Sequence, residues 1–405
     1  MRQFISFNQS IQLLDDIILN HQATQKLFLI QALDCILAQD IIAHENSPAY
    51  PTSAMDGYAI RFKDQTLKEL TLIDKSPAGS ITESIVSKGL CIKTFTGSLM
   101  PQGSDTLIPI ENVEVLENIV TIKQEVPENF AVREVGENYK ENEVLIKKGT
   151  KIGFAQIGVL ASLNISQVLV YVNPTIAIAS TGSEILDLGE VQTNASQIRS
   201  SNHLTLQAIA QKNGANVIQM GIVKDDINSI THLLQEGLHK ADIVVTTGGV
   251  SVGDYDFVQD VVKNKLGAKV LFHGVNMKPG MHVLIAQKEN KFIISLPGFA
   301  YSSTVCAIIY MLKMIYKFRN GNERLCQVKA KMTQNYAKKI PKTIFSACNV
   351  TYKNGEYWVD FEGKRNGTSA ILTNMLGNCA LLIQEENSQD LKAGDCVDII
   401  LLKDL

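Results

Sequence analysis

The sequence predicts a multidomain protein that combines an α/β domain, built on a central parallel sheet, with β domains. From residue 173 to 322, continuous apolar runs alternate with helical stretches, as in βαβ units whose parallel strands are buried on both faces. In 45–144 and again in 323–405, short β-branched runs are separated by Gly, Pro and Asn. These two patterns indicate a small β domain, a central α/β domain and a C-terminal β domain that resembles a barrel.

The beginning of the chain is predicted to be mostly helical from about residue 7 to 43. Apolar residues recur there roughly at helical spacing, at Ile11, Leu13, Leu14, Ile17 and Ile18. A second apolar stretch, from Leu27 to Ile42, extends the helical interpretation. We expect residues 1–44 and 145–172 to form one helical and extended domain.

The other segments follow from their own local signals. Strands are expected at Leu70–Ile73, Thr106–Ile110, Ile119–Ile122, Thr175–Ala179, Ala215–Met220 and Ala241–Thr247. Helices are expected up to about Asn213 and Lys240, and from Tyr301 to Tyr316. Turns at Asn354-Gly355, Asn366-Gly367 and Gly377-Asn378 indicate short strands in the C-terminal domain.

The composition excludes several classes of protein. A chain of 405 residues with 45% apolar content forms folded cores, and its net charge of −3 gives no general attraction for nucleic acid. No apolar run is long enough to cross a bilayer, so we expect a cytoplasmic protein without a membrane partner. Seven cysteines without a CxxC pair predict reduced thiols rather than a disulfide framework or a zinc knuckle.

The sequence that follows Ala241–Thr247 carries the richest chemistry. The apolar strand runs directly into Gly248 and Gly249, at the end of a strand where open α/β sheets bind ligands. Glycines let backbone N–H groups approach an anion, and Ser251 adds a hydroxyl. Asp254 and Asp256 would repel a bare phosphate, so they indicate a bridging cation such as Mg²⁺. An ordinary turn with solvated acids is the alternative.

Three further segments are candidate anion-binding sites at other strand ends or turns. They are Ser180–Glu184, Lys278-Pro279-Gly280 and Leu296-Pro297-Gly298. A capped turn or a surface lysine is the alternative for each. Outside the α/β domain, Ser53–Ala59 and Thr96-Gly97-Ser98 are candidate loops, for which a structural role is equally open.

Nine motifs occur in one order along nearly the whole chain: SAMDGYA, FTG, PxGSD, REVGEN, STGSEI, SSN, TTGGVSVGDYDF, MKPG and LPG. In this order they resemble the molybdopterin molybdenumtransferase family, the bacterial MoeA proteins related to the gephyrin E domain. The resemblance implies a central domain like MoaB and MogA, and an L-shaped homodimer of four-domain subunits. Its active cleft would lie between the α/β domain of one chain and the small β domain of the other.

The resemblance also implies a reaction in which adenylylated molybdopterin and molybdate give molybdenum cofactor and AMP, assisted by Mg²⁺. A molybdopterin adenylyltransferase would be the upstream partner. Among residues that match family positions, those expected to be catalytic are Asp56, Thr96, Glu184 and Lys278. Those expected to bind substrate are Ser180, Thr181, Gly182, Asp225, Asp226, Gly248, Gly249, Ser251, Pro297 and Gly298, and those expected to bind the metal are Asp254 and Asp256.

The chain departs from the family pattern at several of these motifs. The differing positions are Asn138, Ser183, Gly274, Met281, His282, Phe299 and Ala300. Two acidic residues and some positive charge are lost, and the rim becomes bulkier. Two alternatives therefore stand beside the transferase: a non-catalytic pterin-binding paralogue, and an enzyme of the same fold that uses another oxyanion such as tungstate.

Overall fold

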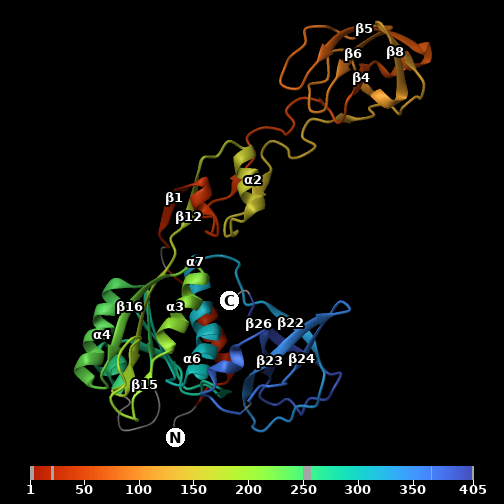
Figure 1. Cartoon of the computed structure of the whole chain (residues 1–405). Helices are drawn as coiled ribbons and strands as arrows, with labels where there is room; N and C mark the ends of the chain where they lie inside the picture. Colours follow the sequence, from red (N-terminus) through yellow and green to blue (C-terminus); the bar gives the residue numbers. More distant parts are fainter. Residues whose placement is uncertain (1–3, 20–21, 250–256, 366, 404–405) are drawn as a thin grey trace. The chain divides into compact units, whose positions relative to one another are not determined.

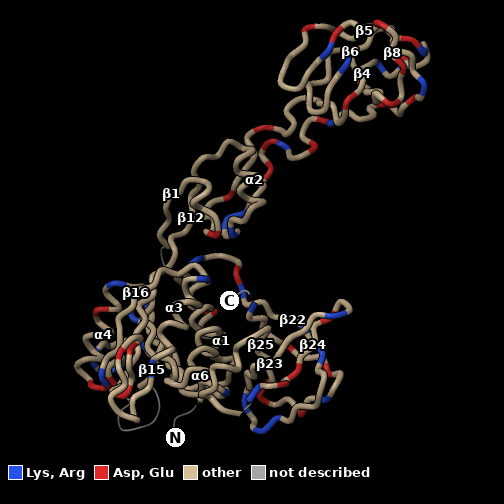
Figure 2. The backbone as a smooth tube through the Cα atoms, viewed as in Figure 1, with Lys and Arg blue, Asp and Glu red and all other residues tan. Residues whose placement is uncertain are grey.

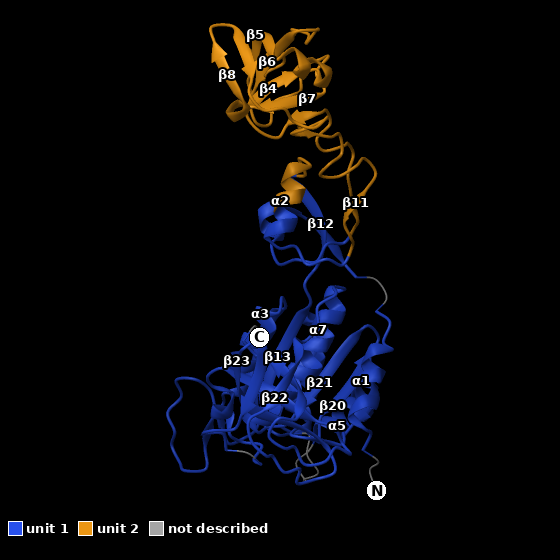
Figure 3. Cartoon of the chain, turned by 90° about the vertical axis from the view of Figure 1, so that its right-hand side faces the viewer, with its two compact units in different colours: residues 1–38, 149–157, 166–405 blue, residues 39–148, 158–165 orange. Residues whose placement is uncertain are grey.

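The computed structural model describes residues 4–19, 22–249, 257–365 and 367–403. Contacts divide the chain into two compact units, shown in different colours in Figure 3. Unit 1 contains residues 1–38, 149–157 and 166–405, and unit 2 contains residues 39–148 and 158–165. Acidic and basic residues are interspersed along both units (Figure 2). The finer division into four domains stays a prediction.

The N-terminal segment is helical only at its start. Helix α1 (Phe7–Asp15) begins after Ser6, whose side chain accepts a hydrogen bond from the Gln9 N–H. The helix predicted over Leu27–Ile42 is wrong, because this stretch forms strand β1 (Thr24–Phe28), the 3₁₀ turn η1 (Leu29–Ala32) and strand β2 (Ile41–Ile42). Strand β1 pairs antiparallel with β12 (Gln167–Tyr171), a distant partner that local periodicity does not reveal.

Unit 2 is built around a six-stranded sheet in the order β7-β4-β6-β5-β9-β8. These strands are β4 (Gly57–Ile60), β5 (Glu69–Ser76), β6 (Leu90–Thr94), β7 (Thr106–Pro109), β8 (Val113–Leu116) and β9 (Ile119–Ile122). Two short pairs join β3 (Thr52–Ser53) to β10 (Val132–Arg133), and β2 to β11 (Val144–Ile146). The 3₁₀ turns are η2 (Phe62–Leu67) and η3 (Ile110–Asn112), and helix α2 (Phe154–Ser162) has residues in both units.

Unit 1 contains the predicted α/β domain, whose six-stranded sheet has the order β16-β13-β17-β21-β20-β18. The first four strands are parallel, namely β13 (Thr175–Thr181), β16 (Asn216–Val223), β17 (Ile243–Thr247) and β21 (Lys291–Leu296). Antiparallel pairing adds β20 (Leu284–Lys288) and β18 (Lys269–His273). A separate short pair joins β14 (Ile185–Leu186) to β15 (Ile198–Arg199). The expected parallel-sheet fold class is confirmed.

Helices cover both faces of this sheet (Figure 1). One face packs against α3 (Asn202–Lys212) and a continuous helical stretch made of α6 (Ala300–Cys306), the π-helical turn η5 (Ala307–Met311) and α7 (Leu312–Arg319). The other face packs against α4 (Ile227–Lys240), α5 (Phe257–Asp260) and the π-helical turn η4 (Val261–Lys265). Ile176 and Ile178 point into the first core and Ala177 into the second, which explains the continuous apolar strand sequence.

The C-terminal strands close into a barrel. Strands β23 (Thr343–Lys353), β24 (Glu356–Asp360), β22 (Gln327–Met332), β26 (Cys396–Leu401) and β25 (Cys379–Gln384) pair in this order, and β25 pairs back to β23. The 3₁₀ turn η6 (Leu372–Met375) precedes β25. At the β23–β24 hairpin, Asn354 and Gly355 both have positive φ, as a two-residue turn requires. The predicted barrel-like C-terminal domain is therefore confirmed.

The described helices and the cysteine thiols each bear on a prediction made from the sequence. No helix in the described part of the chain is both long and apolar enough to cross a membrane. All seven cysteines are free thiols. Burial raises the pKa of Cys91 to about 12 and also raises that of Cys306, so these thiols stay protonated at neutral pH.

Candidate active site

The carboxyl ends of neighbouring parallel strands border one cavity of about 840 Å³, which lies within unit 1. Strand β13 ends in Ser180 and Thr181, β17 in Thr247, and β21 continues into Pro297 and Gly298. Asp225, just after β16, also lines the cavity. The volume suits a ligand the size of a nucleotide or a pterin, and the position is the expected one for an open α/β sheet.

Glycines allow the strand-end loops to pack closely beside this cavity. Gly248 has φ +96°, and a Cβ there would lie 2.6 Å from the carbonyl oxygen of Thr181. Gly249 has φ +65°, and a Cβ would lie 2.8 Å from a methyl carbon of Val258. The Gly248 N–H donates to the Leu296 carbonyl, which joins the loops after β17 and β21. No larger residue fits at either glycine without displacing its neighbours.

Three predicted acids take different positions. Glu184 and Asp225 line the cavity. Asp226 instead caps helix α4, where its carboxylate accepts from the Ser229 N–H at 2.9 Å. These hydrogen bonds from Ser229 hold the pKa of Asp226 below its usual value. Of the two adjacent aspartates, Asp225 is therefore the one that can face a ligand.

Lys278 also lines the cavity, on strand β19 (Met277–Lys278). This strand pairs in parallel with β23, so the C-terminal barrel holds it in place. The Lys278–Pro279 peptide bond is cis. At Gly280, with φ +96°, a Cβ would lie 2.1 Å from the Cys306 sulfur, so only glycine fits beside helix α6. A lysine in a half-buried wall can offset the charge of an anion.

Several lining residues were not predicted as site residues. From the α/β domain these are Ile198, Arg199, Ser200, Ser201 and Asn202, and from the C-terminal barrel and its loops they are Ile340, Lys342, Ser369 and Ala370. The SSN motif was a signal for the first group, because Asn202 donates to the Gly298 carbonyl at 2.7 Å and joins two strand-end loops. No local signal marks Lys342 or Ser369, which lie in a different domain from the glycine loops.

The departures from the family pattern have structural counterparts. At Gly274, a Cβ would lie 2.2 Å from the Phe4 ring, so the N-terminal segment occupies the place of a longer side chain. The Phe4 ring also meets His282 edge to face, with centroids 5.9 Å apart. Met281 contacts the Lys342 ammonium through its sulfur at 2.7 Å, and Phe299 is 63% exposed at the start of α6. Positive charge beside residue 281 is thus supplied by Lys342.

Two expected site residues, Asp56 and Thr96, form a pair within unit 2. The backbone N–H and the hydroxyl of Thr96 both donate to Asp56 Oδ1, each at 2.8 Å. These bonds, with Lys93 nearby, hold the pKa of Asp56 below its usual value. At Gly57, a Cβ would lie 2.4 Å from the Ile108 carbonyl oxygen, so the motif glycine lets strand β4 run close to β7. At Asn138 the backbone N–H donates to the Ser47 carbonyl, and the side-chain amide donates to the Ser47 hydroxyl at 3.4 Å.

The expected metal ligands, Asp254 and Asp256, lie outside the described residues, as does Ser251. Within the described ranges, no group of three or more His, Cys, Asp or Glu residues could hold a metal ion. Glu184 and Asp225 supply two carboxylates to the cavity wall. Carboxylate oxygens are the ligand type that Mg²⁺ prefers, so the described wall is chemically compatible with such a metal.

Comparisons with known proteins agree with this arrangement. A model of the MoeA N-terminal region, domains I and II, matches residues 5–164, and a model of a probable molybdopterin binding domain matches residues 177–317. The molybdopterin molybdenumtransferase of Staphylococcus aureus strain Mu50 is 32% identical over 394 residues, which cover 95% of this chain and 93% of the relative. The chain belongs to the molybdopterin molybdenumtransferase family, the MoeA proteins.

Two further comparisons extend this result. The molybdopterin molybdenumtransferase of Staphylococcus epidermidis strain RP62A is 29% identical and covers 92% of this chain and 90% of the relative. The crystal structure of a molybdopterin biosynthesis MoeA protein from Pyrococcus horikoshii OT3 superimposes with a TM-score of 0.84 at 27% identity. That superposition covers 98% of this chain and 100% of the other. The MoeA likeness thus extends over the C-terminal barrel as well as the two matched regions.

Proposed function

We propose that this MoeA-family chain inserts molybdate into adenylylated molybdopterin, giving molybdenum cofactor and AMP. The observation that carries the proposal is the single cavity that the loops after β13, β17 and β21 line together with Lys278. Such a cavity offers backbone N–H groups, hydroxyls and a cationic side chain to an anionic ligand. Full-length similarity to named transferases supports the same reaction.

The residues that line the cavity would bind different parts of the substrate, according to their chemistry. Lys278 would neutralise a phosphate of the adenylylated pterin, while the glycine loop at Gly248 lets the ligand approach the backbone. Glu184 and Asp225 would accept hydrogen bonds from the pterin ring, whose ring N–H and amino groups are donors. Binding both ends of the ligand orients its dithiolene for metal insertion.

Asp56 would help to place molybdate. Its lowered pKa keeps it ionised at neutral pH, and its two bonds from Thr96 fix its orientation. An ionised carboxylate repels a bare oxyanion, so Asp56 would act through a proton of the oxyanion or through a bound cation. An Asp56→Asn enzyme that inserts molybdenum at the normal rate would exclude this role.

Mg²⁺ belongs to the proposal as an assisting ion. Asp254 and Asp256, which lie outside the described residues, would bind it. When bound, Mg²⁺ would offset the charge of the pyrophosphate that links pterin and adenosine. Activity measured after removal of divalent cations, and after their return, tests this part separately.

We also propose a cytoplasmic homodimer that receives its substrate from a molybdopterin adenylyltransferase. Several large apolar side chains are exposed to solvent: Phe28 is 58%, Ile30 71% and Phe154 91% exposed. Solvent-exposed apolar residues of this size favour burial against another protein surface. Light scattering after size exclusion measures the mass, and a monomer at micromolar concentration would contradict the homodimer.

A complementation experiment tests whether two copies share each active site. Asp56→Asn and Lys278→Ala chains, each inactive alone, are co-expressed with different tags and the mixed dimer is purified. If residues from both copies complete a site, the mixed dimer recovers up to about half the activity, because one of its two sites has both residues. Recovery is not expected if each chain carries a complete site.

The direct test of function is a single-turnover assay with purified protein, adenylylated molybdopterin, Mg²⁺ and molybdate. AMP release is followed together with reconstitution of a molybdenum-dependent enzyme. We expect AMP to appear only when molybdate is present, and active cofactor to form with it. Binding of the pterin without turnover would instead indicate a non-catalytic paralogue, and preference for tungstate in competition would change the assigned oxyanion.

A further inference from the structure

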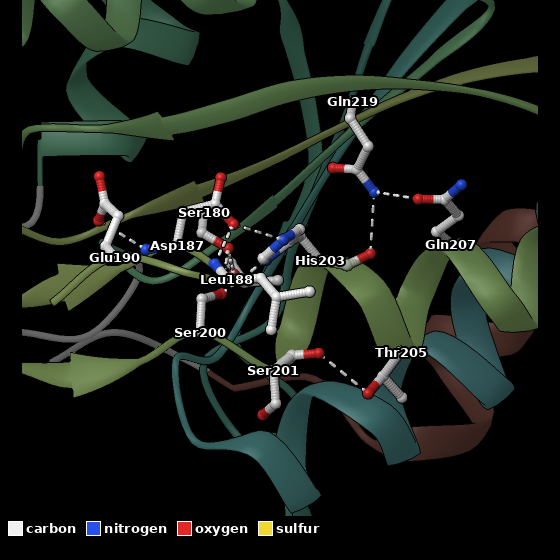
Figure 4. A network of polar contacts seen from close by, with 11 residues as sticks. Ser180, Asp187, Leu188, Glu190, Ser200, Ser201, His203, Thr205, Gln207 and Gln219 are labelled. Atoms are coloured by element: carbon white, nitrogen blue, oxygen red, sulfur yellow. Dashed lines mark hydrogen bonds and ion pairs between the residues drawn. The ribbon is translucent and has the colours of Figure 1, made fainter.

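A chain of polar contacts runs from Asp187 through His203 and Ser200 to Ser180 (Figure 4). His203 lies in the first turn of α3. Its Nε2 is 3.3 Å from Oδ1 of Asp187, and its Nδ1 is 2.8 Å from the hydroxyl oxygen of Ser200. The Ser200 hydroxyl lies 3.3 Å from that of Ser180, which lies 3.0 Å from that of Thr247. Ser200, Ser180 and Thr247 line the cavity, whereas His203 is only 5% exposed.

The direction of this chain depends on the protonation state of His203. An ionised Asp187 can only accept, so His203 Nε2 must carry a hydrogen. In a neutral ring, Nδ1 then has a lone pair and accepts the Ser200 O–H. Ser200 next accepts from Ser180, and Ser180 accepts from Thr247. All three hydroxyl hydrogens point toward His203, and the cavity is left with hydroxyl lone pairs.

A protonated His203 reverses the direction. Its Nδ1–H donates to the Ser200 oxygen, which releases the Ser200 hydrogen to donate to Ser180 or to a ligand. When Ser200 donates to Ser180, Ser180 in turn donates to Thr247, and the Thr247 hydrogen becomes free to point into the cavity. A tetrahedral oxyanion offers only acceptor oxygens, so it interacts favourably with donors and unfavourably with lone pairs.

We propose that Ser200, Ser180 and Thr247 form a relay that positions a tetrahedral oxyanion group in the cavity, and that His203 sets its direction. Binding of the oxyanion is coupled to uptake of one proton by His203. The inference rests on the proposed function for the identity of the ligand, a phosphoryl group or molybdate. His203 and Asp187 are positioning residues, since they act through the Ser200 hydroxyl.

The surroundings of His203 contain few other charges. Asp187 contacts it, and behind Asp187 lie Glu190, which accepts from the Asp187 N–H at 2.8 Å, and Arg199, which donates to the Glu190 carbonyl at 2.7 Å. Strands β13 and β16, which pack against α3, have no titratable side chain. Titratable groups on the other packed helical elements bond elsewhere: Tyr301 to Phe345, Cys306 to Gly280, Tyr310 to Ser10, Lys313 and Lys317 to Asp15, Tyr316 to Asn213, and Arg319 to Glu323. The carboxylate of Asp187 is thus the charged group that contacts the His203 ring.

Sulfate is the probe of choice, because it has four acceptor oxygens and does not titrate between pH 5 and 9. Calorimetry on the full-length protein, in two buffers of different ionisation enthalpy, measures the protons taken up per sulfate bound. We expect uptake approaching one proton near neutral pH. Sulfate affinity should fall as pH rises, by up to about tenfold per pH unit, which is the slope for one coupled proton. Competition with AMP or with molybdate then shows which oxyanion source the relay serves.

Variants isolate the relay from a general structural effect. His203→Asn should abolish proton uptake, and Ser200→Ala should abolish uptake and weaken sulfate binding. Asp187→Asn, at a side chain that is 47% exposed, reduces uptake without touching the core. His232→Asn is the matched control, since His232 also lies near a carboxylate, that of Glu236, but is 82% exposed on α4. The His232→Asn variant should leave the proton uptake per sulfate unchanged.

Three results would overturn the relay: sulfate binding without proton uptake, proton uptake that persists in His203→Asn, or no sulfate binding at all. Thermal unfolding of each variant shows whether it is folded. The assay for molybdenum insertion is independent of these results. Proton-coupled sulfate binding in a protein that does not insert molybdenum would contradict the proposed function and leave the relay intact.

Discussion

Thr96 donates both its backbone N–H and its hydroxyl to one oxygen of Asp56, Oδ1, at 2.8 Å each. The two residues come from different β-strand ends of unit 2, after β6 and before β4. Their pairing orients an ionised carboxylate and lowers its pKa. The strength of this pair can be measured without an activity assay.

Thr96→Val should raise the pKa of Asp56 part of the way to its usual value, because the hydroxyl bond is lost and the backbone bond remains. Thr96→Ser retains both donors and should keep the pKa low. The lowered pKa contributes stability above the usual carboxyl range, and this is lost as pH falls through the folded-state pKa. Carbon-detected NMR titration of Asp56 measures the change, and identical titrations in Val and Ser variants would contradict the assigned hydroxyl bond.

Gly248→Ala should destabilise the protein more than an alanine at an equally strained but open glycine. Gly394 is the matched control, with φ +90° against +96° at Gly248 and no atom within 4 Å of an added Cβ. Both variants carry the left-handed backbone cost of about 1–2 kcal/mol. At Gly248 the contact with Thr181 adds about 1–3 kcal/mol. Denaturant titration measures the difference, and equal losses would show that the loops do not pack closely.

Met281→Lys should strengthen AMP binding but lower stability, because a second ammonium group would lie beside Lys342. We expect a gain in affinity of about twofold to fivefold, which corresponds to about 0.4–1 kcal/mol. The like-charge contact should cost up to about 1 kcal/mol of stability. The exchanged variant Met281→Lys/Lys342→Met should regain stability. If it stays as unstable as the single variant, repulsion is not the cause.

Arg319→Leu should destabilise unit 1 strongly. The Arg319 side chain is 2% exposed and pairs with Glu323 at 2.7 Å, and it also donates to the carbonyls of Asn213 and Asp34. Removing one partner of a buried ion pair costs about 3–5 kcal/mol. Arg319→Leu/Glu323→Leu should recover part of that loss. Thermal and denaturant unfolding measure both variants, and a loss below about 1 kcal/mol would exclude a central role for the pair.

The parts of this protein that were predictable from sequence are those whose signal is local. The α/β alternation was visible because strands such as β13 and β17 are buried on both faces and hence continuously apolar. Candidate residues at Gly248, Lys278 and Gly298 were visible because turns at strand ends have distinctive residues, and all three border the cavity. The order of motifs identified the family before any contact was known.

Tertiary structure decided whatever depends on contacts between distant residues. The stretch from Leu27 was expected to be a helix, but its backbone pairs with β12, and no local pattern contains that partner. The choice of Asp225 over Asp226 depended on which of two adjacent acids caps α4. Lys342 beside Met281, and His203 behind Ser200, likewise became visible only when the chain was folded. Sequence determined the kinds of chemical groups at the strand ends because periodicity and turn chemistry are local, whereas packing across domains determined which groups meet.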